Sequence, residues 1–126
     1  MIRIVSALVS VLALLGVSAS LQAQQPAPLS LEQRMSLRCS AAFALVAHGQ
    51  ASGDVRALAY PLLGDDAREF FVRAAAQVMD EAGLDEEGIR AALAAEAQDL
   101  VDHDSIAPVM EVCLPQLGQL EAAPRR

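Results

Sequence analysis

The chain has 126 residues, enough for one domain, and it carries 16 acidic residues against 9 basic ones, all of them arginine. This acidic balance argues against a protein that binds nucleic acid or an anionic membrane surface through a basic patch. Aromatic residues make up only 3% of the chain, so its core must be built from smaller aliphatic side chains, which favours helices over a sheet.

Residues 1–23 have the pattern of a secretory signal peptide. Arg3 gives the positive start, an apolar run covers 4–17, and small residues follow. We predict cleavage after Ala23, with Ala19 as the alternative position. The apolar run is short for a membrane anchor. We therefore expect a periplasmic or secreted protein that has no membrane attachment after cleavage.

A first helix is predicted to follow an extended lead-in at residues 24–29. Ser30 and Gln33 have the spacing of a capping box, which marks the start of a helix. Gly49 is its predicted end, because glycine readily adopts the left-handed conformation found there. Apolar residues recur between these limits at helical spacing, namely Leu31, Met35, Cys39, Ala42, Phe43 and Val46.

The far side of this first helix is apolar as well. It carries Leu37, Ala41 and Ala44, with His48 on the polar side near the predicted end. One interpretation is that the helix is covered by the rest of the chain from more than one direction. The other is that these four residues form an exposed face for an unidentified protein partner or for self-association.

Residues 51–64 are expected to connect the first two long helices, with Asp54 capping a short turn. A capping box at 66–69 predicts the start of a second helix, which runs to about Ala82 and is ended by Gly83. Its apolar stripe comprises Ala67, Phe70, Phe71, Ala74, Ala75, Val78 and Ala82.

Two further helices complete the predicted domain. Asp85 has the position of an N-cap for the third, and residues 102–105 form the break before the fourth. Pro115 is expected to end or kink the fourth helix near Leu114. The apolar stripe of the third helix is Ile89, Leu93, Ala97, Leu100 and Val101. That of the fourth helix is Ile106, Val109, Met110, Cys113, Leu114 and Leu117.

These elements define the expected fold class. It is an all-α protein, a small bundle of four to five short helices, with the helical domain at residues 30–118 and a frayed tail at 119–126. The two cysteines behind an export signal predict a disulfide, and with two cysteines the pairing is Cys39–Cys113. No Cys-x-x-Cys pair or four-ligand zinc pattern supports a redox or metal role.

Two charged residues fall at or within apolar stripes. Arg38 lies at the edge of the first helix's stripe and Glu96 inside that of the third. A buried charge needs a partner, so one hypothesis is a partly buried Arg38–Glu96 ion pair that fixes the register of the two helices. The alternative is that each side chain reaches solvent independently.

The sequence offers no recognisable catalytic or cofactor site. His103 is flanked by Asp102 and Asp104, but adjacent residues point in different directions, so a solvated turn is expected rather than a metal site. Phosphate loops, nucleophile elbows and zinc-protease motifs do not occur. We therefore predict no metal, no cofactor and no enzymatic activity.

Several short motifs resemble a group of small exported proteins of alphaproteobacterial type. They are residues 38–45, Tyr60-Pro61, residues 68–72, residues 79–84 and Cys113-Leu114. The resemblance implies a secreted, helical, two-cysteine domain of a group whose function is not established, and it assigns no site residues.

Three functions remain as hypotheses at this stage. The first is a periplasmic binding or interaction module without catalysis. The second is a periplasmic acid or stress chaperone, since protonation of 16 carboxylates at low pH would leave a positively charged domain. The third is an enzyme with an unrecognised site.

Overall fold

The computed structural model describes residues 28–122, so the predicted signal peptide and the last residues of the tail lie outside it. Within this range it contains four α-helices, one 3-10 turn and no strand, which confirms the all-α fold. The elements are α1 (Leu31–Ser52), η1 (Ala57–Ala59), α2 (Gly64–Ala82), α3 (Glu86–Asp102) and α4 (Ile106–Ala122).

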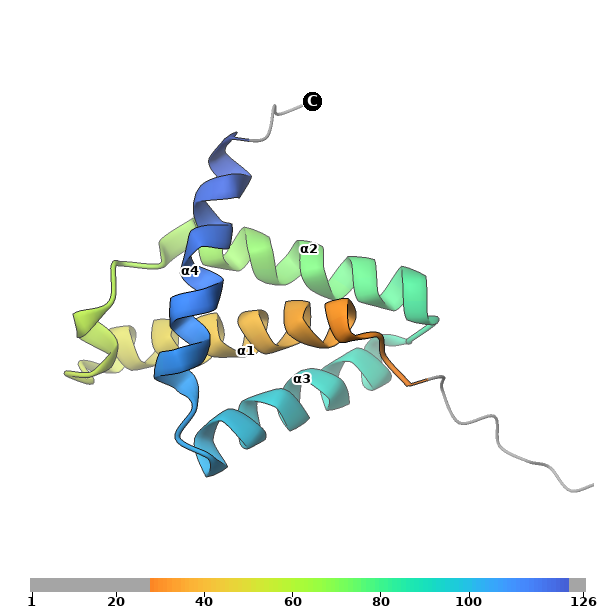
Figure 1. Cartoon of the computed structure of the whole chain (residues 1–126), viewed down its shortest axis with the longest axis horizontal. Helices are drawn as coiled ribbons and strands as arrows, with labels where there is room; N and C mark the ends of the chain where they lie inside the picture. Colours follow the sequence, from red (N-terminus) through yellow and green to blue (C-terminus); the bar gives the residue numbers. More distant parts are fainter. Residues whose placement is uncertain (1–27, 123–126) are drawn as a thin grey trace, which may run out of the picture.

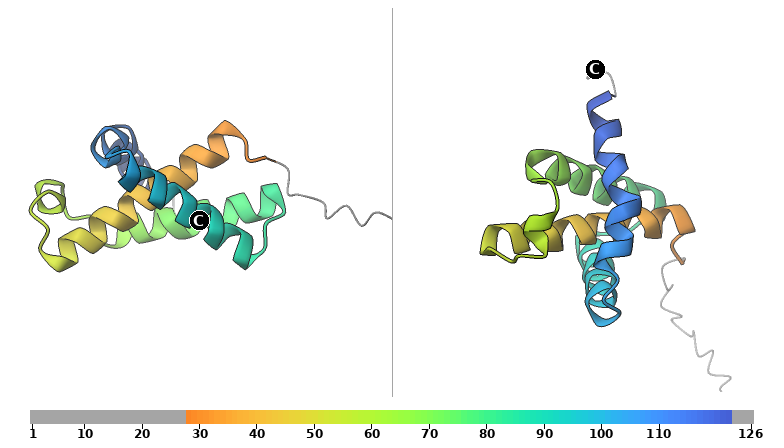
Figure 2. Two further views of the ribbon diagram at one scale, coloured as in Figure 1. Left: turned by 90° about the horizontal axis from the view of Figure 1, so that it is seen from below. Right: turned by 60° about the vertical axis from the view of Figure 1, so that its left-hand side comes forward.

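Helix α1 is the central element of the bundle. Figure 1 shows it lying between α2 and α3, with α4 crossing over it, and the views in Figure 2 agree. It contacts each of the other three helices and the 3-10 turn. None of the described helices is both long and apolar enough to cross a bilayer.

The burial pattern of α1 explains why it occupies the centre. Consecutive residues 39–43 are all buried, and consecutive positions on a helix point in all directions around its axis. Leu37, Val46 and Gly49 are buried as well. The expectation that other parts of the chain cover this helix from more than one direction is therefore confirmed.

The core has two parts, one at each end of α1. The larger is formed by α1, η1, the start of α2, the end of α3 and α4, and it includes a T-shaped contact between Phe43 and Phe70 with ring centres 5.2 Å apart. The smaller contains Leu37, Val78 and Ile89, where α1, α2 and α3 meet. Buried apolar contacts therefore support α1 from Leu37 to Val46.

The disulfide Cys39–Cys113 is present and joins α1 to α4 within the larger core. Both cysteines are fully buried, and their Cα atoms lie 5.5 Å apart. The two cysteines lie 74 positions apart in the sequence. For a loop of this length the chain-entropy model gives a stabilisation of about 4.5 kcal/mol.

The start of α1 follows the sequence pattern, but its end does not. Ser30 and Gln33 form the predicted capping box. The helix then passes through Gly49 and ends at Ser52, followed by Gly53 as the C-cap with a φ of 80°. Gly49 serves another purpose, because a Cβ added there would lie 2.6 Å from the Cβ of Ala57. Glycine at this position allows η1 to pack directly on α1.

Helix α2 begins earlier than its capping box predicts. It starts at Gly64 after Leu63, which makes no side-chain cap, so the prediction that Asp66 caps the helix is wrong. Asp65 and Asp66 instead lie in the first turn, where the helix dipole favours negative charge. The predicted end is confirmed, since Gly83 adopts the left-handed conformation.

The predictions for α3 are largely confirmed. Asp85 caps the helix by accepting a hydrogen bond of 2.7 Å from the backbone N–H of Gly88, and the helix ends at Asp102. Val101 departs from the predicted inner stripe, because it is 55% exposed.

Helix α4 is longer than predicted, because it continues through Pro115 to Ala122. Proline removes one hydrogen bond from the helix. Pro115 and Glu111, whose carbonyl loses that bond, are both exposed, so water can hydrate the free carbonyl. The prediction that the helix ends near Leu114 is therefore wrong, and the predicted tail at 119–126 begins within the helix.

Candidate functional site

The interaction face proposed for α1 does not exist as a continuous surface. Leu37 packs in the smaller core against Val78 and Ile89, and Ala41 lies in the larger core. Both are buried because neighbouring helices cover α1 on this side too, whereas Ala44 and His48 are exposed. An interaction face built on Leu37 and Ala41 is therefore wrong.

The ion pair proposed between Arg38 and Glu96 is present and belongs to a larger network. An Nη1 atom of Arg38 lies 2.9 Å from Glu96 Oε2 and 2.7 Å from Asp99 Oδ2. Its Nη2 donates to the hydroxyl of Ser105 at 3.3 Å. One side chain of α1 thus holds the last turns of α3 and the residue that precedes α4.

The network shifts the pKa values of Arg38 and Asp99. Hydrogen bonding to Asp99 raises the pKa of Arg38, which stays charged, and the Arg38 guanidinium holds the pKa of the Asp99 carboxyl below its ordinary value. His103 adds to the second effect, since its Nδ1 lies 3.1 Å from Asp99 Oδ1. The guanidinium of Arg38 thus pairs with two carboxylates, and this arrangement suits a structural role.

The residues flanking His103 do not form a metal site. No group of three or more His, Cys, Asp or Glu side chains within residues 28–122 is arranged to hold a metal ion. The Nδ1 atom of His103 instead contacts Asp99 near the end of α3. It lies 3.1 Å from the Oδ1 atom of Asp99 and 3.0 Å from the backbone carbonyl oxygen of the same residue.

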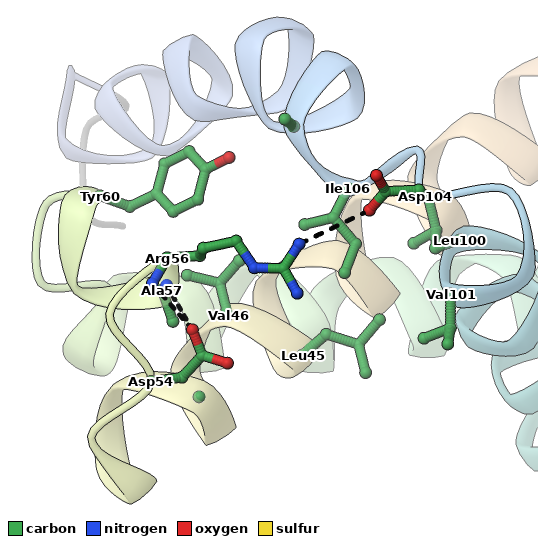
Figure 3. A pocket seen from close by; sticks show the side chains of 12 residues that line it. Leu45, Val46, Asp54, Arg56, Ala57, Tyr60, Leu100, Val101, Asp104 and Ile106 are labelled. Atoms are coloured by element: carbon green, nitrogen blue, oxygen red, sulfur yellow. Dashed lines mark hydrogen bonds and ion pairs between the residues drawn. The ribbon is translucent and has the colours of Figure 1, made fainter.

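A cleft of about 310 Å³ lies at the end of α1. Figure 3 shows it between η1, the last residues of α3 and the start of α4. Its apolar lining comprises Leu45, Val46, Ala57, Leu100, Val101, Ile106 and Ala107, joined by the ring of Tyr60. We call this feature the α1–α3–α4 cleft.

Two side chains fix the η1 wall of the cleft. The amide nitrogen of Gln50 lies 3.1 Å from the carbonyl oxygen of Ala57 and also reaches the carbonyls of Tyr60 and Pro61. Asp54 Oδ1 accepts from the backbone N–H groups of residues 56 and 57, as predicted for a turn cap. These bonds hold the connector in one conformation on α1.

Three charged residues surround the mouth of the cleft. Figure 3 shows the side chain of Arg56 extending across the cleft towards Asp104, with Asp54 on the η1 side. The Arg56–Asp104 contact is long, at 3.9 Å, and the two side chains are 85% and 92% exposed. Such exposed pairs contribute little to stability. Two carboxylates and one guanidinium therefore lie at the mouth, and the guanidinium is only weakly bound to Asp104.

Sequence reasoning found Asp54 but missed the cleft. Residues 51–64 were expected only to connect two helices, and Gly49 was expected only to end one. One signal was available: Val101 is an apolar residue at the edge of its stripe, and in the structure it lines the cleft. The rest depends on how α3 and α4 meet the connector, which no local pattern specifies.

Comparison with known proteins gives no further guidance, since no protein-family model, curated protein or solved structure matches the chain.

Proposed function

We propose that this protein is a small exported binding module without catalysis, and that it holds an apolar ligand in the α1–α3–α4 cleft. The cleft itself is the observation that supports this proposal. Its volume of about 310 Å³ lies at the lower end of the range for small-molecule sites, and its lining is mostly apolar with a few polar groups at the mouth.

The frame around the cleft also suits binding. The buried disulfide ties α1 to α4, and the Arg38 network ties α1 to α3. A site whose walls are held by such contacts needs little reordering when a ligand enters, which lowers the cost of binding. The hydrogen bonds of Gln50 hold the third wall in the same way.

The protein contains an intrinsic fluorescent reporter of binding in this cleft. Tyr60 is the one tyrosine of the chain, there is no tryptophan, and the Tyr60 ring lines the cleft. Titration of the oxidised protein with octanol, an uncharged apolar probe, should produce a saturable change in tyrosine fluorescence. A linear response without saturation would contradict the proposal.

A matched pair of variants tests whether the probe binds in the cleft. Ala107→Phe adds a ring to a residue that lines the cleft and should abolish the saturable response. Ala76→Phe makes the same change at an exposed position of α2 outside the cleft and should leave the response intact. Equal binding by both variants would place the ligand elsewhere.

Export is part of the same proposal. It is supported by the signal-peptide pattern of residues 1–23 and by the disulfide, which persists in oxidising compartments. Mass spectrometry of protein recovered from a periplasmic extract should give a chain that begins after Ala23, or after Ala19. A chain that retains Met1 would contradict it.

A further inference from the structure

We propose that the ligand of the α1–α3–α4 cleft is a small organic cation, an ammonium or guanidinium group carried on an apolar body. This inference rests on the function proposed above and adds the charge of the ligand. It follows from the arrangement of Asp54, Arg56 and Asp104 around an apolar interior.

The two carboxylates are placed to receive a positive charge. Asp54 and Asp104 both line the cleft, one at the connector and one at the turn between α3 and α4. Backbone N–H groups of Ala57 and Arg56 occupy Oδ1 of Asp54 and lower the pKa of this carboxyl, so Asp54 stays ionised at neutral pH. Tyr60 adds an aromatic ring in the same cleft, and ring faces attract cations.

Arg56 shows how such a ligand would lie. Its side chain extends across the mouth of the cleft, with the guanidinium pointing towards Asp104 (Figure 3). The contact is long and the side chain is 85% exposed, so Arg56 can leave the cleft at little cost. A cationic ligand would take its place between the two carboxylates and bury a larger apolar body beneath.

The charge of the rest of the protein favours the same choice. Of the 25 charged residues in the chain, 16 are acidic, and their combined field attracts cations and repels anions. An anionic ligand would gain Arg56 as a partner but would approach Asp54 and Asp104 at the same mouth. The balance of charge therefore favours a cation.

The test compares three probes of equal chain length. Octylammonium, octanol and octanoate are titrated at pH 7 with tyrosine fluorescence as the readout. We expect octylammonium to bind more tightly than octanol, and octanoate to bind most weakly. Octanoate binding as tightly as octylammonium, or tighter, would overturn the inference and leave the proposed function standing. The absence of saturable binding by all three would overturn both.

Removing the negative charges and removing the positive charge at the mouth should change the affinity for octylammonium in opposite directions. Asp104→Asn and Asp54→Asn should each weaken octylammonium binding about twofold to fivefold, as expected for partly solvated charge pairs, and should weaken it more than octanol binding. Arg56→Ala should strengthen octylammonium binding, because it removes the competing guanidinium. The exposed Asp80→Asn serves as the control and should change none of the affinities. Weaker octylammonium binding by Arg56→Ala would contradict the inference.

Discussion

Arg38 holds both sides of the turn between α3 and α4. Its side chain and that of Glu96 are only 24% and 18% exposed, so loss of Arg38 would leave a partly buried carboxylate without its partner. We expect Arg38→Met to lower the free energy of unfolding by about 2 kcal/mol, the scale of a hydrogen bond between charged groups. Chemical denaturation measures this change.

The control is the exposed i,i+4 pair of Glu69 and Arg73 in α2. Arg73→Met should cost less than about 1 kcal/mol, because water screens that pair. A double-mutant cycle of Arg38→Met with Glu96→Gln then isolates the interaction. A coupling energy indistinguishable from zero would remove the idea that this pair fixes the register of α1 and α3.

Asp99 makes the stability of the protein depend on pH. Hydrogen bonding to Arg38 lowers its pKa in the folded state. Its stabilising effect is therefore complete above the ordinary pKa of about 3.9 and is lost as the pH falls through the lower folded value. At pH 6 the wild type should be more stable than Asp99→Asn, and the difference should shrink below about pH 4.

Denaturant titrations at a series of pH values measure this difference. The matched variant is Asp80→Asn, an exposed position of α2. Its difference from the wild type should stay nearly constant over the same range. A stability difference between wild type and Asp99→Asn that increased as the pH fell would contradict this prediction.

The close packing of η1 on α1 makes a prediction about two glycines. Gly49→Ala should be destabilising by about 1–3 kcal/mol, because the added Cβ would lie 2.6 Å from the Cβ of Ala57 and overpack the contact. Helix propensity alone would predict the reverse, since alanine is favoured over glycine in a helix.

Gly118 of α4 provides the comparison, because among the described residues nothing beyond its own helix backbone lies within 4 Å of the position that its Cβ would take. Gly118→Ala should therefore stabilise the protein by up to about 1 kcal/mol. Thermal unfolding of the two variants should give shifts of opposite sign. Stabilisation by Gly49→Ala would show that η1 does not depend on this close approach.

These elements show where local sequence is informative. The capping box of Ser30 and Gln33, the N-cap Asp85 and the left-handed Gly83 were predicted, because each depends on contacts within a few residues. The predictions that α1 ends at Gly49 and that α4 ends near Pro115 were wrong. Glycine and proline disfavour helices by propensity, but the packing of η1 on Gly49 and the exposure of Pro115 allow both helices to continue.

The candidate site was less accessible to sequence reasoning. The α1–α3–α4 cleft joins residues from α1, η1, α3 and α4, and its mouth brings Arg56 to Asp104 across 48 positions of the chain. The interaction face failed for a related reason. The apolar pattern of α1 shows that its second side is apolar, but only the packing of α2 and α3 shows that this side is covered.

For the whole molecule, the disulfide is expected to contribute much of the stability. Loss of the bridge in the double variant Cys39→Ala and Cys113→Ala should cost about 4.5 kcal/mol, by the entropy of a loop closed between cysteines 74 positions apart. This is a large share of the 5–15 kcal/mol that is typical of a folded domain. Denaturation of the wild type and the double variant measures the loss.

The burial of both sulfur atoms makes a second prediction about the same bond. A mild thiol reductant should leave the folded protein oxidised and reduce it only in denaturant, since attack requires access to a sulfur. Reduction of the native protein at the rate of the denatured one would show that the bridge is exposed in solution.

Amide chemical shifts measured during an octanol titration show whether the α1–α3–α4 cleft binds an apolar ligand. We expect saturable shifts at residues that line the cleft, such as Val46, Ala57 and Ala107, with no comparable changes around Val78 and Ile89 in the smaller core. Shifts centred on that second group, or spread evenly over the bundle, would contradict this expectation.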